Sequence, residues 1–80
     1  LQAYLAEFPV RHGVEPSEHM HEGAEFFHVI EGSVIIRYQD EEHLMETGDS
    51  VYFDSSAPHS YQAAGELTAR AIVITTPPRV

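Results

Sequence analysis

The sequence contains no cysteine, no lysine and no long apolar run. Without cysteine there are no disulfides and no thiolate metal ligands, which is typical of a protein kept in the reducing cytoplasm. No apolar stretch approaches the roughly 20 residues that cross a bilayer, and the pattern of a signal peptide is missing. We therefore expect a cytoplasmic protein that does not enter a membrane.

Positive charge is also scarce. Four arginines stand against 13 acidic residues, which gives a formal net charge of −9 with the histidines neutral. Nucleic-acid binding requires a basic surface that displaces counterions, so we expect no direct contact of this segment with DNA or RNA. An anionic membrane surface is disfavoured for the same reason. The acidity itself is explained by solubility, and attraction of cations is the alternative.

The chain is short, and its 80 residues make one small domain. A domain of this size buries a low fraction of its surface, so a metal, closure of a sheet into a barrel or a partner subunit is expected to help stabilise it. The chain begins at Leu1 and not at methionine. We interpret residues 1–80 as one domain of a longer chain.

Alternation of apolar and polar residues with a period of two, punctuated by turn residues, predicts short strands and no helix. About eight or nine strands are expected, with a tight hairpin at Glu31-Gly32-Ser33 and a charged turn at Asp40-Glu41-Glu42. Evenly spaced short strands are typical of an all-β sandwich or barrel. The expected strands cover residues 2–8, 18–22, 25–30, 33–39, 43–46, 50–53, 59–62 and 67–75.

Three of these strands are apolar on both faces, at residues 26–30, 34–36 and 72–74. Such strands have one side toward the barrel interior and the other toward a second sheet or a partner. The first and last strands, 2–8 and 67–75, are expected to expose unpaired edges that must be covered. We therefore expect a symmetric homodimer that covers or pairs them.

Histidine and glutamate mark a candidate metal site. His19 and His21 lie two residues apart, so on an extended strand they project from the same face. Glu25 adds an anionic oxygen nearby, and His59 must come from elsewhere in the fold. Imidazole and carboxylate suit a divalent transition metal, namely Fe, Mn, Zn or Ni, while the absence of cysteine argues against Cu(I).

Other residues have simpler interpretations. His28 has the opposite strand parity to Glu25, so it should point away from the metal and pack. His12 and His43 are expected to be exposed to solvent. Tyr52 and Tyr61 either line the barrel interior or pack in it. Glu25 has an alternative role as an acceptor that orients a ligating histidine.

The spacing Gly13-x5-His19-x-His21-x3-Glu25-x6-Gly32 resembles the first motif of the cupin family at all five positions. This motif is specific, and the resemblance covers the chain from about residue 13 to residue 75.

The second cupin motif is kept in part, with Gly48 in place and His59 at the position of the ligand histidine. Asp54 stands where the family usually has proline, Ser56 where it has glycine and Ala63 where it has asparagine. These departures affect residues that shape loops and leave the ligand set intact.

The resemblance implies a double-stranded β-helix, a small jelly-roll-like barrel, with a metal held in its interior by His19, His21, Glu25 and His59. Four protein ligands on an ion that reaches six-coordination leave open positions for water, dioxygen or a substrate. Zn²⁺ would be satisfied by four ligands and would give a closed site.

Two further stretches, 48–59 and 72–78, look like the C-terminal cupin domain of bacterial transcriptional regulators, in which a helix-turn-helix domain comes first. This predicts a metal-binding domain that senses a small-molecule effector and sets the dimer, while the preceding domain contacts DNA. Arg37 or Arg70 would pair with an anionic effector if either faced inward.

Two alternatives stay open. One is a metal-dependent cupin enzyme of the dioxygenase, isomerase or epoxidase type, with Glu25, Tyr52 and Tyr61 as candidates for acid or base and no distinctive motif around them. The other is a metal-free binding or assembly module in which the ligands are vestigial. The catalytic residues, the effector and the native metal are not determined by the sequence.

Overall fold

The structure is a computed structural model that describes residues 2–10 and 18–76. Within these residues it contains seven strands and no helix. The strands are β1 (Gln2–Phe8), β2 (Ala24–Glu31), β3 (Val34–Tyr38), β4 (Glu41–Met45), β5 (Ser50–Asp54), β6 (His59–Ala63) and β7 (Ala69–Thr76). The sequence predictions for Gly13, His12 and the loop at 11–17 lie outside the described residues, as do those for residues 77–78.

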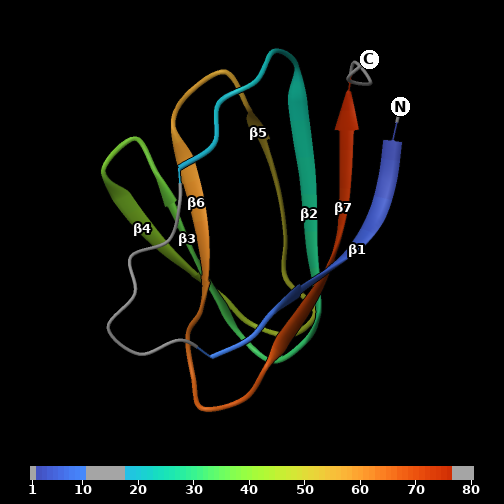
Figure 1. Ribbon diagram of the computed structural model, residues 1–80, viewed down its shortest axis with the longest axis vertical. Helices are drawn as coiled ribbons and strands as arrows, with labels where there is room; N and C mark the ends of the chain where they lie inside the picture. Colours follow the sequence, from blue (N-terminus) through green and yellow to red (C-terminus); the bar gives the residue numbers. More distant parts are fainter. Residues whose placement is uncertain (1, 11–17, 77–80) are drawn as a thin grey trace.

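The strands form two antiparallel sheets that face each other (Figure 1). One sheet has the order β1-β7-β2-β5, and the other has the order β4-β3-β6. Because β1 and β7 are the first and last strands, the two ends of the described chain pair with each other in the larger sheet, and β1 forms its edge. The all-β architecture expected from the period-two pattern is confirmed.

The core lies between the two sheets. Alternate residues of β2 and β7 point inward, so Phe27 and Val29 are fully buried, and so are Ala69 and Ala71. This alternation follows from the pleat, which sends successive side chains to opposite faces. The buried apolar residues are Phe27, Val29, Val34, Ile36, Met45, Ala69, Ala71 and Val73.

The outer face of the larger sheet is apolar and exposed. Ile72 of β7, beside Leu5 of β1 in the ladder, is 39% exposed. The next row across the sheet joins Ile74 to Phe26 and then to Tyr52 of β5. The runs that are apolar on both faces therefore cover the core with one face and form an apolar outer surface with the other.

Two sequence predictions about local structure are wrong. Residues 18–22 do not form a strand, because only His19 finds a strand partner, in a single bridge to His59. Glu31-Gly32-Ser33 is no hairpin, because β2 and β3 belong to different sheets. Gly32 has a φ of 75° and passes so close to Ala69 that an added Cβ would lie 3.0 Å from the Ala69 Cα.

Two others are corrected in detail. The turn before β4 is made by Gln39 and Asp40, with φ values of 48° and 69°, and the strand begins at Glu41. Two residues with positive φ between paired strands form the tight turn that matches the twist of a hairpin. Strand β7 is not an edge either, because it lies between β1 and β2.

Candidate metal centre

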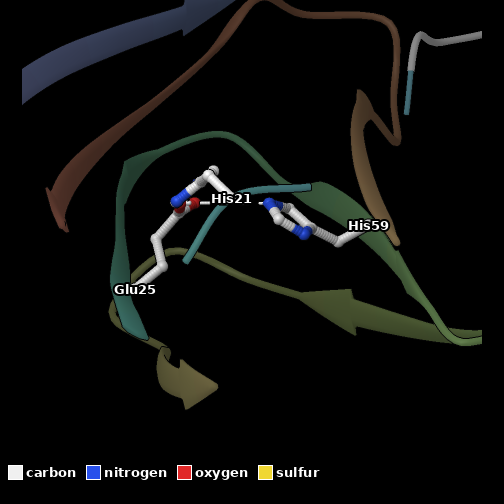
Figure 2. A group of neighbouring side chains, drawn as sticks. All are labelled: His21, Glu25 and His59. Atoms are coloured by element: carbon white, nitrogen blue, oxygen red, sulfur yellow. Dashed lines mark hydrogen bonds and ion pairs between the residues drawn. The ribbon is translucent and has the colours of Figure 1, made fainter. Parts of the chain in front are cut away.

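His21, Glu25 and His59 converge at one end of the space between the sheets (Figure 2). One nitrogen or carboxylate oxygen from each residue lies within 4.8 Å of the corresponding atoms of the other two. Glu25 comes from β2, His59 begins β6 and His21 precedes β2 on an extended segment. Three of the four residues predicted from the sequence are thus brought together.

Glu25 is directed inward by its strand parity. It lies on the same face of β2 as Phe27, with Phe53 and Thr75 beside it on the neighbouring strands. The residue is 2% exposed, and its Oε1 atom has no hydrogen-bond partner among the described residues. A buried carboxylate oxygen without a partner is costly, so this position favours a cation beside it.

His59 is held in one orientation by its own loop. Its Nδ1 atom lies 2.8 Å from the carbonyl oxygen of Ala57. A carbonyl oxygen only accepts, so Nδ1 carries the proton and Nε2 presents a lone pair. That Nε2 atom is buried, finds no hydrogen-bond partner in the part of the chain that the structure describes, and lies 3.9 Å from Glu25 Oε2. Such a backbone contact is the usual device that orients a metal-ligating histidine.

His21 is positioned by backbone hydrogen bonds to the segment before β6. Its amide donates to the carbonyl of Ser55 at 2.9 Å, and the Ser55 amide donates to the carbonyl of Gly23 at 3.0 Å. Gly23 turns the chain into β2 with a φ of 104°, a conformation in which glycine is favoured. The imidazole Nε2 then lies 3.0 Å from Glu25 Oε2.

These residues fit a metal ion. Two ligand atoms bound about 2.1 Å from one ion at a right angle lie about 3 Å apart, which is the separation of His21 Nε2 and Glu25 Oε2. The orphaned Glu25 Oε1 and His59 Nε2 atoms would gain a partner. The donor set of two imidazoles and one carboxylate suits a divalent transition metal, as expected from the sequence.

A cavity of about 330 Å³ opens beside this group. His19 lines it together with the three convergent residues, but it stays outside their 4.8 Å group. Its ring centroid lies 6.1 Å from that of His59. The structure thus places His19 at the cavity wall, and its role as a fourth ligand remains a prediction. The residues that line the cavity are Gln2, Tyr4, Ala6, Phe8, His19, His21, Glu25, His59, Tyr61, Val73 and Thr75.

Two tyrosines contribute to the cavity. Tyr61 lines the cavity, which agrees with the prediction that it either lines the barrel interior or packs in it. Tyr52 lies outside the cavity and is 68% exposed. Tyr4 also lines the cavity and was missed by sequence reasoning. Partial burial, and then the negative charge of Glu25, raise the pKa of the Tyr4 hydroxyl. The alternation of the first strand places Tyr4 on the same face as Phe8, but only the pairing of β1 with β7 shows that this face is the inward one.

Other candidates lie away from the site. His28 Nδ1 forms a hydrogen bond with Ser50 Oγ at 2.6 Å on the outer face of the larger sheet, as its strand parity predicts. His43 is exposed beside Glu41, as expected. Arg37 pairs with Glu42, and Arg70 Nε lies 3.1 Å from Glu7 Oε2. Neither arginine lines the cavity.

Asp54 and Ser56 rebuild the turn that proline and glycine form in the second motif. Asp54 Oδ1 accepts hydrogen bonds from the Ser56 hydroxyl at 2.7 Å and from the Ser56 amide at 2.9 Å. An aspartate that bonds the backbone two residues ahead is a standard turn former. The Ser56 hydroxyl and then its amide lower the pKa of the Asp54 carboxyl. These two hydrogen bonds fix the turn that leads to His59 without the proline and glycine of the second motif.

The fold and the site together define a small two-sheet barrel with a candidate mononuclear metal centre in its interior. The family model described as "Cupin domain" matches residues 4–75. The chain therefore belongs to the cupin family, and the expected double-stranded β-helix is confirmed.

Solved structures extend this comparison. The chain is similar to Fe(II) HppE in complex with its substrate, with 25% identity, a TM-score of 0.82 and coverage of 91% of this chain and 44% of that one. It is similar to hydroxypropylphosphonic acid epoxidase from S. wedmorenis in complex with fosfomycin, with 25% identity, a TM-score of 0.82, and coverage of 91% and 42%. Co(II) HppE in complex with Tris buffer gives 26% identity, a TM-score of 0.82, and coverage of 91% and 44%.

The chain spans less than half the length of these solved proteins. No protein of curated function matched the chain. Within the described residues, no helix has the length and apolar character needed to span a membrane.

Proposed function

We propose that His21, Glu25 and His59 bind one divalent transition metal, with His19 at the cavity wall as the fourth ligand predicted from the sequence. The observation that carries this proposal is the pair of buried, unpartnered atoms, Glu25 Oε1 and His59 Nε2, in a group whose donor atoms lie within 4.8 Å. The backbone contact of His59 Nδ1 with Ala57 supports it, because it directs the free nitrogen toward Glu25.

We further propose that this centre serves a metal-dependent enzyme that acts on a small oxygenated molecule. Two histidines and one carboxylate with open positions are typical of non-haem Fe(II) oxygenases. When bound, such an ion polarises a coordinated oxygen atom and, as Fe(II), supports oxygen chemistry. The likeness to Fe(II) and Co(II) HppE and to an epoxidase supports this role.

The protein's own residues would position the substrate and limit access of water. Glu25 and His59 are almost completely buried, so the floor of the cavity is closed to solvent. Phe8 and Val73 give the wall apolar surface, while the hydroxyl of Tyr4 provides a donor beside the ligand group. Fixed polar groups in an otherwise apolar cavity orient a small substrate.

The metal is tested first by elemental analysis of untagged protein beside a His21→Ala/His59→Ala control. We expect one equivalent of Fe, Mn, Zn, Ni or Co after reconstitution, and loss of it in the control. If neither protein retains a metal, the metal-free binding module becomes the better account. Oxygen uptake by Fe(II)-loaded protein with a panel of small hydroxy acids and keto acids then tests the enzyme, and uptake equal to that of the Glu25→Gln variant with every one of them would contradict the enzyme role.

The second candidate is the effector-binding and dimerisation domain of a helix-turn-helix regulator. The exposed apolar outer face of the larger sheet, with Leu5, Ile72 and Tyr52, favours a role in self-association. In this role the metal would hold a small-molecule effector, and the domain would form the C-terminal part of a longer protein that contacts DNA elsewhere. An effector must then favour one dimer arrangement over another.

Sedimentation tests the proposed homodimer. We expect a dimer at micromolar concentration and its dissociation by Ile72→Glu on the outer face. A monomer in both proteins would remove the support for the regulator, and the enzyme would remain.

A further inference from the structure

Tyr61 is partly buried between the sheets and carries a hydroxyl group without a partner among the described residues. Its ring stacks on Phe27, with centroids 4.8 Å apart and an interplanar angle of 10°, and packs against Phe8 at 5.7 Å. Its hydroxyl oxygen is buried and has no hydrogen-bond partner. Buried polar atoms in native proteins are nearly always paired, so an unpaired one calls for a partner.

The surroundings of Tyr61 show where such a partner would lie. Tyr61 lines the cavity beside the metal group, and its ring centroid lies 5.7 Å from that of His59 and 6.4 Å from that of His19. The contacts with Phe27 and Phe8 hold the ring on its packed sides. Among the described residues no group partners the hydroxyl, and the cavity that Tyr61 lines has room for a molecule that could do so.

We propose that Tyr61 is a positioning residue whose hydroxyl donates a hydrogen bond to an oxygen atom of the small molecule bound in this cavity. This inference rests on the proposed metal centre, because the molecule binds between the metal and Tyr61. The molecule that such a site would bind is compact, with oxygen-containing groups and a short apolar body. A cavity of about 330 Å³ admits a ligand of this size.

The charges around the cavity narrow the class of ligand that it can bind. Among the described lining residues, Glu25 supplies a negative charge, and no arginine or lysine is present. Arg37 and Arg70 pair with Glu42 and Glu7 instead. With a divalent ion bound, the charges of the ion and Glu25 sum to about +1, so a neutral or singly charged hydroxyl, keto or hydroxamate oxygen leaves no excess negative charge in the site, whereas a doubly charged group would.

The test compares Tyr61→Phe with the natural protein after loading with Co(II). Acetohydroxamate and benzohydroxamate serve as probes because each offers two oxygen ligands and an apolar group, and binding is read from the visible absorption of Co(II). We expect about a 3- to 10-fold loss of affinity for the probe that reaches Tyr61, the size of one hydrogen bond. Tyr52→Phe, on the outer face, is the matched control and should change nothing.

Two further measurements separate positioning from structure. Tyr61→Phe should leave Co(II) affinity unchanged and should keep or raise the melting temperature of the metal-free protein, since the lost hydroxyl had no partner. Unchanged affinity for both probes would overturn the inference, as would an equal loss of Co(II) affinity or a lowered melting temperature. A natural protein that binds no Co(II) would overturn the proposed metal centre and the inference with it.

Discussion

The backbones of His19 and His59 form a reciprocal pair of hydrogen bonds. The His19 amide donates to the His59 carbonyl at 2.7 Å, and the His59 amide donates to the His19 carbonyl at 3.1 Å. This bridge joins the segment that carries His21 to the start of β6. Two stretches far apart in the sequence are thereby held in register, and the ligand group depends on that register.

Single alanine substitutions should rank the ligands. We expect His21→Ala and His59→Ala to lose most of the metal affinity, and His19→Ala to lose less, because its ring lies outside the convergent group. The readout is thermal unfolding with and without metal, since an ion that binds only the folded state adds about 2.7 kcal/mol at one hundred times its Kd. His43→Ala is the matched control, because this histidine is exposed on β4. Equal losses for His19 and His21 would instead make His19 a full ligand.

Glu25→Gln should separate stability from metal binding. In the metal-free protein we expect a gain of about 1 kcal/mol, because the amide N–H can donate to a histidine lone pair and the buried charge disappears. Metal-dependent stabilisation should fall sharply in the same variant. Urea unfolding with a chelator and then with metal measures both effects. A less stable metal-free variant would show that the contact between His21 Nε2 and the Glu25 carboxylate stabilises the fold by more than the buried charge destabilises it.

Gly32→Ala should destabilise the fold by about 2 to 3 kcal/mol. The residue has a φ of 75°, and an added Cβ would lie 3.0 Å from Ala69 Cα, so backbone strain and a clash add together. Gly48→Ala is the matched control because Gly48 has a φ of 95° with open space around it. It should lose only the backbone part, about 1 kcal/mol. Equal losses in urea unfolding would mean that the chain moves away from Ala69 at little cost.

Ionisation of the Tyr4 hydroxyl should destabilise the fold in alkaline solution. Partial burial, and then the charge of Glu25, raise the pKa of Tyr4 above its ordinary value of 10.0. The contribution of the neutral Tyr4 hydroxyl to the free energy of unfolding is therefore fully present below pH 10. It is lost as the pH rises through the raised pKa of the folded protein. The effect should be small, because the side chain is half exposed and solvent screens it.

Ultraviolet difference titration of the natural protein against Tyr4→Phe measures this pKa directly. Glu25→Gln should lower the pKa of Tyr4 part of the way toward its ordinary value, and burial should account for the remainder. A Tyr4 pKa that does not respond to Glu25→Gln would place the carboxylate too far from the hydroxyl to act.

Local patterns in the sequence predicted the strands well, because the period of two records which side chains face the core. They also predicted Glu25 and His59 as neighbours, through the resemblance to a known motif. The hairpin at Glu31-Gly32-Ser33 could not be excluded, because a tight turn and a crossing between sheets use the same residues. Which strand lies beside β3 is decided by long-range pairing with β6, and that information is spread over the whole chain.

The same limit applies to the site. The segment around His19 and His21 alternates like a strand, yet only one bridge forms there, because the neighbouring backbone is the loop before β6. Tyr61 could not be assigned to the cavity from the sequence, since its parity is set by the pairing of β6 with β3. Tyr4 acquired a role only when β1 was seen to pair with β7.

The pairing of β1 with β7 also makes the barrel suitable for circular permutation. Gln2 lies opposite Thr75 in the ladder, so the two strand ends are about 5 Å apart. A short glycine-rich linker could join them, and new termini could open at the exposed Gln39-Asp40 turn without removing any ladder partner. Such a circular permutant would keep His21, Glu25 and His59 in place while moving β1, β2 and β3 from the beginning of the chain to its end.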